Sequence, residues 1–253
     1  MSPSQELIDR LASAHRVAAF TGAGISAESG VATFRAQDGL WSKFKPEELA
    51  SVDAFLANPQ MVWEWYQARR AVILEAEPNA GHRALVELEE LVPSVSVITQ
   101  NIDGLHTAAG SREVIELHGN IRRNYCQQCR RRYDGEELLH LKAVQACECG
   151  GKIRPDVVWF GENLPAGAFE RAEHRAEAAD VFFSIGTSAV VYPAAGLPVL
   201  AAQSGAYLVE INPEATPLTR YANESIRSAS GTALAGIVQL LRGHLAADGR
   251  AGN

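Results

Sequence analysis

The residues of this sequence that most clearly specify a chemistry are its cysteines, which all fall in one window. Cys126, Cys129, Cys147 and Cys149 follow the pattern C-x2-C-x17-C-x-C, and two glycines come directly after the last of them. Four thiolates at such a spacing can close a tetrahedron around Zn²⁺; a redox pair and unliganded thiols are the alternatives. Because four sulfur ligands leave no open coordination position, we expect one structural zinc ion and no catalysis at the metal.

Polar residues stand at the carboxyl ends of four apolar runs, which is where an open α/β sheet binds its ligand. They are Gln100, Asn101, Asp103, His118, Thr187, Ser188 and Asn212. Any one of them can be an ordinary turn residue, but together they outline a single polar crevice. His118 is the only member of the set whose side chain ordinarily titrates near neutrality, so it is the candidate general base. The alternative is a histidine with a purely structural hydrogen bond.

A glycine-rich turn follows the first apolar run of the chain. Gly22, Gly24 and Ala27 fit the pattern G-x-G-x-x-[GA], in which small residues let the backbone approach a pyrophosphate at the N-terminus of a helix. The acidic residue that holds the ribose in dehydrogenases, about 20 residues further on, has no candidate, because Asp38 and Glu47 lie in segments that we expect to be loop or helix. The chain therefore binds a dinucleotide in another way than a dehydrogenase does, or not at all.

A sheet must position these residues, because short runs rich in Val, Ile and Phe recur along the chain. Each is predicted to be a buried parallel strand. The runs are 16–20, 94–99, 114–117, 156–160, 181–186 and 207–211. Helical patterns lie between several of them, at 4–14, at 79–91 with Asn79 as the N-cap, at 166–178 and at 231–245. The alternation predicts an α/β fold with a Rossmann-like, doubly wound parallel sheet.

Two stretches interrupt this alternation and are predicted to form a smaller second domain. One carries helical periodicity with a segment rich in Trp and Tyr, and the other carries the cysteines. We expect the large, Rossmann-like domain to comprise residues 1–36, 77–120 and 153–253. The small domain, a helical module plus a zinc ribbon, comprises residues 37–76 and 121–152.

Composition and charge limit the class of protein. The chain has 253 residues, and 30 acidic against 23 basic side chains give a formal net charge of −7. An acidic chain is not held to nucleic acid by its overall field, so no specific nucleic-acid partner is expected. The N-terminus does not read as a secretory signal, and the most apolar long stretch, 188–209, contains two prolines, so no membrane segment is expected. The protein is predicted to be cytoplasmic and monomeric.

Taken in order, these motifs resemble those of the sirtuins, a family of NAD-dependent protein deacylases. The matching segments are GAGISAESGVATFR (22–35), DGLW (38–41), TQNIDGLHTAAG (99–110), ELHGN (116–120), the four cysteines, RPDVVWFGE (154–162), GTS (186–188) and INPE (211–214). They cover about residues 16–240. The resemblance implies that NAD and an acyl-lysine peptide meet in a cleft between the large domain and the small zinc-ribbon domain.

The resemblance also implies a role for individual residues. The NAD site is lined by Gly22, Ala23, Gly24, Ser26, Phe34, Arg35 and Trp41. The nicotinamide and its ribose are surrounded by Gln100, Asn101, Ile102 and Asp103. The residues toward the adenosine are Gly186, Thr187, Ser188, Asn212, Pro213, Glu214 and Ala233. The acyl-lysine lies against Val158, Trp159, Phe160 and Gly161. His118 is the catalytic base, and Asn101 and Asp103 are further catalytic residues.

In the mechanism that this resemblance implies, the acyl oxygen of the lysine attacks the ribose carbon as nicotinamide leaves. His118 then removes a proton from a ribose hydroxyl, which attacks the acyl carbon. NAD is consumed as a co-substrate and no hydride moves, which explains the missing dehydrogenase acid; the products are the deacylated lysine, nicotinamide and O-acyl-ADP-ribose. Mono-ADP-ribosyl transfer to protein and a catalytically inactive, NAD-sensing zinc-ribbon scaffold remain the alternatives.

A further pair of residues bears on the acyl group. Tyr66 and Arg69 are three positions apart, so on a helix they share a face, where a guanidinium beside a phenol can hold a carboxylate. This Tyr-x-x-Arg pair resembles that of the sirtuin class that removes succinyl and malonyl groups from lysine; the alternative is a surface arginine beside a packing tyrosine. The residues around Phe34, Ala36 and Val158 leave room for acetyl, so we expect both deacetylation and desuccinylation of acylated-lysine proteins.

Overall fold

The larger of two sheets in this protein provides the edge at which its ligand cavity lies. The computed structural model describes residues 3–33, 45–133 and 135–249. In them, six parallel strands have the order β3-β2-β1-β7-β8-β9. The strands are β1 (Arg16–Thr21), β2 (Ser94–Thr99), β3 (Val114–Glu116), β7 (Val181–Ile185), β8 (Tyr207–Ile211) and β9 (Glu224–Ile226). The predicted doubly wound sheet is confirmed, and its topological switch point lies between β1 and β7.

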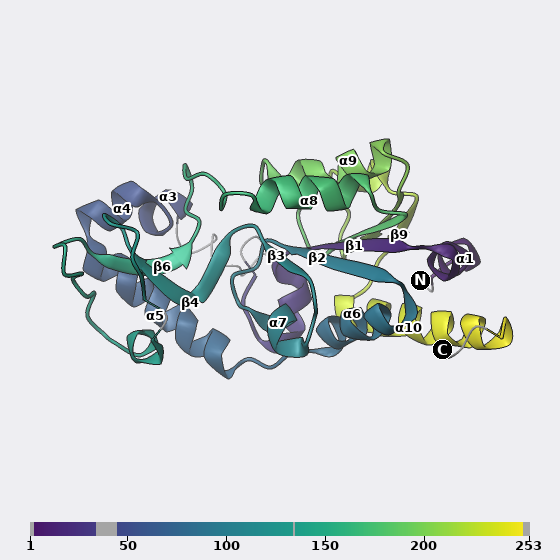
Figure 1. Cartoon of the computed structure of the whole chain (residues 1–253), viewed down its shortest axis with the longest axis horizontal. Coiled ribbons are helices and arrows are strands. Elements are labelled where there is room, and N and C mark those ends of the chain that lie inside the picture. Colours follow the sequence, from purple (N-terminus) through teal and green to yellow (C-terminus); the bar gives the residue numbers. More distant parts are fainter. Residues whose placement is uncertain (1–2, 34–44, 134, 250–253) are drawn as a thin grey trace.

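Helices cover both faces of this sheet (Figure 1). One face carries α1 (Gln5–Ser13), α6 (Ala80–Leu91) and α10 (Ser230–Ala247). The other face carries α8 (Ala168–Glu177) and α9 (Leu197–Gln203). The apolar side chains of the two helix layers form two separate hydrophobic clusters with the strands between them, so the sheet is buried on both sides, as its nearly continuous apolar strands require.

All four predicted helices are present. α6 illustrates the local cause, because the Asn79 side chain accepts a hydrogen bond from the Gly81 N–H and caps the helix, as predicted. Among the residues that the structure describes, no helix combines the length and the apolar character needed to cross a bilayer.

The smaller sheet is antiparallel and corrects one prediction. Its order is β5-β4-β6, with β4 at Gly119–Cys126, β5 at Arg132–Tyr133 and β6 at Ile153–Val157. The run 156–160 was predicted to be a parallel strand of the main sheet, and this is wrong: the strand ends at Val157 and pairs antiparallel with β4. An apolar run indicates burial but does not specify the partner strand, and this one is buried between β4 and a helix.

That helix is α5 (Pro59–Glu75), which with α3 (Pro46–Leu49) and α4 (Val52–Ala57) packs beside the small sheet (Figure 1). α5 begins after Asn58, whose side chain accepts from the Met61 N–H. A third hydrophobic cluster joins its inner face to β6 and the turn after β6. The remaining short elements are η1 (Ala23–Ser29), α7 (Leu105–Ala109), η2 (Glu136–Leu139), η3 (Ala194–Gly196) and η4 (Thr219–Tyr221).

Candidate active site

A cavity of about 890 Å³ lies at the carboxyl ends of β1, β2, β7 and β8 and extends to the α5 side of the small sheet. This volume falls within the range of about 300–1,000 Å³ that is typical of small-molecule sites. Most of the predicted site residues line it. They are Gly22, Ala23, Gly24, Tyr66, Arg69, Gln100, Asn101, Ile102, His118, Val158, Trp159, Phe160, Gly161, Gly186, Thr187, Ser188, Asn212, Pro213 and Glu214.

Of the predicted NAD-site and acyl-site residues that the structure describes, three do not belong to this lining set. Ser26 and Asp103 are buried directly behind it, and Ala233 lies on α10 within the hydrophobic cluster of the main sheet. Phe34, Arg35 and Trp41 lie outside the described residues, as does Ala36. The sequence prediction therefore mixed residues that face the cavity with residues that support it from behind.

The glycine turn packs against the end of β7. The Gly22 N–H donates to Ile185 O at 3.0 Å and the Gly24 N–H donates to Gly186 O at 2.8 Å. A Cβ atom at Gly24 would lie 2.6 Å from the Cα of Gly186, and one at Gly22 would lie 2.8 Å from its carbonyl oxygen. Both glycines are thus required because the backbone of the turn touches the backbone at the end of β7. The same lack of a side chain also lets the turn approach a ligand closely.

A buried polar network holds the same turn from the side of β2. The Asn101 amide donates to Gly22 O and to Ser26 Oγ, each at 3.1 Å. Ser26 Oγ donates to Asp103 Oδ2 at 2.8 Å, and the Leu105 N–H donates to Oδ1 at 2.9 Å. Burial raises the pKa of Asp103, while these two hydrogen bonds and nearby arginines oppose the rise. Asn101 therefore has two functions, because it faces the cavity and also fixes the glycine turn.

His118 lies between the two sheets, because β3 ends at Glu116 and β4 begins at Gly119. Its ring Nδ1 is 3.0 Å from Gln100 O, so Nδ1 carries the proton and donates, which leaves Nε2 as the basic atom. Burial lowers the pKa of His118, against a smaller opposite effect of that hydrogen bond. The half-buried ring is therefore neutral at neutral pH and can accept a proton, which is the property a general base needs.

The wall of the cavity on the α5 side carries Tyr66 and Arg69. Tyr66 is buried on α5, and its phenol oxygen accepts a hydrogen bond from Trp159 Nε1. The guanidinium of Arg69, one turn along the helix, lies 5.0 Å from the ring centroid of Trp65. Burial lowers the pKa of Arg69, and the negative charge of Asp103 nearby opposes this effect.

A buried ion pair shapes the turn that carries Trp159. Arg154 is fully buried and makes two contacts with Glu162, at 2.7 and 3.0 Å. Its guanidinium carbon lies 3.1 Å from the centroid of the Trp159 ring, and Glu162 accepts from the Trp159 N–H at 2.8 Å. The pair fixes the Trp159 indole, so it supports the wall of the cavity that Trp159 forms.

Thr187 connects the strand ends on the other side of the cavity. Its hydroxyl accepts from the Gln100 amide and its carbonyl accepts from the Asn212 amide, both at 2.9 Å. These bonds join the carboxyl ends of β2, β7 and β8 into one floor, which is where the sequence analysis placed them.

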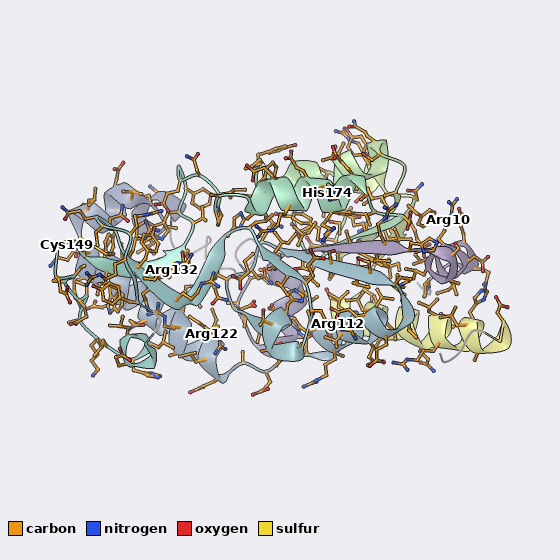
Figure 2. The ribbon with its side chains drawn as sticks, viewed as in Figure 1. Arg10, Arg112, Arg122, Arg132, Cys149 and His174 are labelled. Atoms are coloured by element: carbon orange, nitrogen blue, oxygen red, sulfur yellow. The ribbon has the colours of Figure 1, made fainter. Side chains whose placement is uncertain are left out.

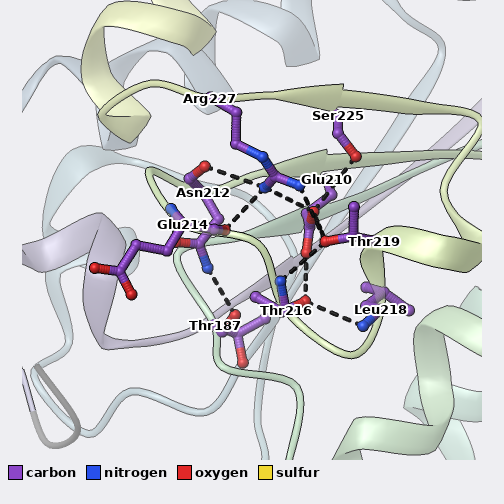
Figure 3. A network of polar contacts seen from close by, with 9 residues as sticks. All are labelled: Thr187, Glu210, Asn212, Glu214, Thr216, Leu218, Thr219, Ser225 and Arg227. Carbon is purple, nitrogen blue, oxygen red and sulfur yellow. Dashed lines mark hydrogen bonds and ion pairs between the residues drawn. The ribbon is translucent and has the colours of Figure 1, made fainter.

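The loop after β8 is held by a network around Arg227 (Figure 3). The guanidinium of Arg227 pairs with buried Glu210 at 2.8 Å and donates to the backbone carbonyl of Glu214, also at 2.8 Å. Glu210 also accepts from Thr219 Oγ1 at 2.7 Å and from the hydroxyl of Thr216. The network therefore presents residues 212–217 to the cavity.

Sequence reasoning missed Arg154, Glu162, Glu210 and Arg227 as contributors to the site. Glu210 did carry a signal, because it is a charged residue inside the apolar run YLVEI, and a charge in a buried strand needs a partner. The identity of that partner, Arg227 on the far side of a loop, had no local signal.

The four cysteines lie together at the end of the small sheet. Their sulfur atoms all lie within 4.8 Å of one another, with Cys126 to Cys149 at 3.5 Å and Cys129 to Cys147 at 3.6 Å. Tetrahedral coordination with Zn–S bonds of about 2.3 Å places sulfurs about 3.8 Å apart, so the set fits one zinc ion. Figure 2 shows Cys149 at the opposite end of the molecule from Arg10, and none of these cysteines lines the cavity, as expected of a structural site.

Fold and cavity define a class: an α/β protein that binds its ligand at the switch point of a parallel sheet and carries a cysteine-rich module. A model of the Sir2 family matches residues 22–193. The NAD-dependent protein deacylase of Aquifex aeolicus is 50% identical over 227 residues, covering 89% of this chain and 95% of that protein. NAD-dependent protein deacylase 1 of Archaeoglobus fulgidus is 45% identical over 239 residues, covering 94% and 98%.

Solved structures agree with these sequence relatives. A serine-to-alanine variant of a Sir2 homologue in complex with ADP-ribose matches with a TM-score of 0.93 at 44% identity, covering 96% of this chain and 98% of that chain. A Sir2 complex with a p53 peptide and NAD+ matches with a TM-score of 0.79 at 36% identity, covering 97% and 98%. The chain belongs to the Sir2 family.

Proposed function

We propose that the protein is an NAD-dependent protein-lysine deacylase that removes succinyl and malonyl groups as well as acetyl groups, and that releases nicotinamide and O-acyl-ADP-ribose. One observation supports the proposed preference for these acyl groups: the charge of Arg69 acts on the phenol of Tyr66, and both residues line the same cavity as His118. Its relatives named as NAD-dependent protein deacylases support the general reaction.

When bound, NAD supplies the ribose carbon that takes up the acyl oxygen and the nicotinamide that departs. This chain's residues then have distinct roles. His118 accepts a proton from a ribose hydroxyl at Nε2, because Nδ1 is committed to Gln100 O. Asn101 orients the ligand at the floor of the cavity, and Asp103, through Ser26, holds the turn on which the ligand lies. We also propose that Phe34, Arg35 and Trp41 contribute NAD contacts.

Charge explains why a carboxylate-bearing acyl group suits this cavity. An arginine remains protonated at neutral pH even when burial lowers its pKa, and a buried cation gains more from a nearby anion than an exposed one does. Tyr66 can donate its proton to the same carboxylate, because its oxygen already accepts from Trp159. A succinyl or malonyl carboxylate would thus meet two donors, whereas an acetyl group needs neither.

The deciding experiment compares matched acetyl-, malonyl- and succinyl-lysine peptides with NAD, following all products by mass. Wild type should release every acyl group, and His118→Ala should release none. Arg69→Met should lower kcat/KM for the succinyl peptide on the order of 100-fold and change that for the acetyl peptide little, since hydrogen bonds to charged groups contribute about 1.5–3 kcal/mol each. Arg69→Lys is the control that keeps the charge. Equal losses on the two peptides would contradict the carboxylate-binding role.

Product masses also separate this proposal from its rivals. A mass increase of the protein target by ADP-ribose would indicate mono-ADP-ribosyl transfer, and NAD that is bound but left intact would indicate the inactive sensing scaffold.

We also propose the two-domain division at 1–36, 77–120 and 153–253 against 37–76 and 121–152. The two clusters of the main sheet, which contain no residue of 37–76 or 121–152, support it. The cluster around α5 crosses the proposed boundary, because it includes Val31, Leu105 and Trp159 of the large-domain ranges. A cytoplasmic monomer acting on acylated-lysine proteins completes the proposal, and light scattering of the purified chain tests the monomer.

A further inference from the structure

Two histidines that the proposed mechanism does not use are buried beneath the floor of the cavity. His82 lies in the first turn of α6 and His106 on α7, with exposed fractions of 0% and 2%. Their ring centroids are 4.8 Å apart and the ring planes are inclined by 61°. Two titratable rings in contact inside the core require an explanation, because imidazoles ordinarily exchange protons with water.

The hydrogen bonds of His82 define its tautomer. The Asn79 N–H donates to Nδ1 of His82 at 3.3 Å, so this nitrogen carries a lone pair. A neutral ring then has its proton on Nε2. Burial lowers the pKa of His82 to about 4, Arg83 adds to this effect and Glu28 opposes it, so the ring is neutral at neutral pH.

The tautomer of His106 follows from its hydroxyl neighbours. Nε2 of His106 is 3.0 Å from Thr21 Oγ1, and the Thr21 hydroxyl donates to Thr99 Oγ1 at 2.8 Å. Because the Thr21 proton is used there, Thr21 Oγ1 accepts from Nε2–H of His106, which leaves Nδ1 with a lone pair. Burial lowers the pKa of His106 to about 3, with His82 adding to the effect.

The two remaining ring atoms are complementary. Nε2 of His82 and Nδ1 of His106 are both buried, and neither has a hydrogen-bond partner within the described parts of the chain. With the tautomers above, the first is a donor and the second an acceptor. If the threonine bond ran the other way, two ring donors would face each other. Since buried polar atoms are nearly always paired, and no direct hydrogen bond joins these two nitrogens, the arrangement favours one buried water that bridges the rings.

We propose that His82 and His106 form a neutral hydrogen-bond relay that positions Asn101 at the floor of the cavity. In it the Asn79 N–H donates to His82, His82 Nε2–H is linked to His106 Nδ1 through one buried water, and His106 donates to Thr21, which donates to Thr99. The relay reaches Asn101 because the Asn101 N–H donates to Thr99 Oγ1 at 3.0 Å. Both histidines are positioning residues that act through Asn101. This inference rests on the proposed function, in which Asn101 orients the bound NAD.

The geometry explains what such a relay contributes. Asn79 also donates through its side chain to Ile25 O at 2.7 Å and to Ser29 Oγ at 2.9 Å. The relay thus begins at η1, passes beneath the sheet and ends at Asn101, which returns to the glycine turn at Gly22 O. The turn is held from both sides by neutral groups in fixed orientations, so its position does not vary across the physiological pH range.

A first test measures the tautomers and needs no activity, so it is independent of the proposed reaction. In ¹⁵N-labelled wild-type protein, two-bond ¹H–¹⁵N correlation spectra should show both rings protonated at Nε2 only and not titrating between pH 5 and 8. No ¹⁵N–¹⁵N coupling between the rings is expected, because the bridging water separates the two nitrogens, and a measurable coupling would contradict that water. A proton on Nδ1 of either ring, or a charged ring, would overturn the relay.

A second test measures function. His82→Asn keeps an acceptor for the Asn79 N–H and removes the donor to His106, while His106→Gln keeps a donor to Thr21. His82→Asn should raise the KM for NAD about tenfold and leave kcat and the KM for the peptide nearly unchanged, since small displacements of orienting groups have effects of this order or larger. His106→Gln should raise the KM for NAD less. His174→Asn, an exposed histidine on α8 (Figure 2), is the matched control. Folded variants with an unchanged KM for NAD would refute the positioning role.

Discussion

The phenol oxygen of Tyr66 accepts a hydrogen bond from the indole nitrogen of Trp159 at 2.9 Å, although the two residues are 93 positions apart. The bond joins α5 to the turn after β6, and the two rings form part of one wall of the cavity. Burial raises the pKa of Tyr66 to about 12, with the Arg69 charge opposing the rise. The phenol therefore keeps its proton in any ordinary assay and can donate it to a carboxylate.

Replacing Tyr66 by phenylalanine should consequently affect acyl groups unequally. Tyr66→Phe removes one donor to the succinyl carboxylate, so kcat/KM for a succinyl peptide should fall about 10-fold or more, while that for an acetyl peptide should fall less. The Trp159 N–H loses its acceptor, which should lower the free energy of unfolding by about 1–3 kcal/mol. Steady-state kinetics and urea denaturation measure the two effects. Tyr221→Phe, at an exposed tyrosine, is the control, and a larger loss on the acetyl peptide would contradict this role.

The pH dependence of the reaction should reflect the lowered pKa of His118. The base must be neutral to accept a proton, and burial moves its pKa below the ordinary value of 6.5. The acid limb of the rate profile should therefore be centred below pH 6.5, at the lowered pKa of His118. The measurement is kcat/KM for an acetyl peptide between pH 5 and 9 at constant ionic strength. An acid limb centred at pH 7 or above would contradict the assigned environment of His118.

Arg227 should control the affinity for NAD without contacting the reacting atoms. Arg227→Met leaves the buried carboxylate of Glu210 unpaired and releases the carbonyl of Glu214. We expect a higher KM for NAD, kcat changed much less, and a loss of about 3 kcal/mol in unfolding free energy. Arg227→Lys keeps the charge and should recover part of both. Nicotinamide release at varied NAD measures the first effect, and an unaltered KM in a folded variant would exclude the loop-holding role.

Metal removal should destabilise the small module first. The purified chain should contain one zinc per molecule by elemental analysis, and a chelator should lower its melting temperature, because structural zinc contributes folding free energy directly. Activity should be lost with it, since Gln127, next to the first cysteine, accepts a hydrogen bond from the Arg154 that fixes Trp159. Cys149→Ser should reproduce the effect without chelator. Full activity in a zinc-depleted chain would show that the cavity does not depend on the module.

The parts of this molecule that the sequence predicted are those in which local pattern and burial agree. The strands β1, β2, β7 and β8 are continuous apolar runs between helices, and only a parallel sheet covered on both faces buries them. The cysteine spacing predicted the cluster for a similarly local reason. His118 was identified because it follows such a run.

The parts that were missed depend on partners distant in the sequence. β4 contains Arg122, Arg123 and Asn124, and no hydrophobic period marks it as a strand. Arg123 pairs there with Glu116 at the end of β3, at 2.7 Å, and with Asp156 on the paired strand β6, at 3.0 Å. Because these ion pairs exist only once β3, β4 and β6 have met, the sequence near β4 does not predict them.

His118 stands where one sheet ends and the other begins, and its own carbonyl accepts a hydrogen bond at 2.9 Å from the N–H of Val158, the residue directly after β6 of the small sheet. The base is thereby fixed by two bodies of structure with separate cores. Local unfolding of either part therefore removes His118 from its catalytic position. The loss of activity should consequently follow the unfolding of the less stable of the two parts. On heating or in denaturant, turnover should therefore stop well before most of the helices unfold.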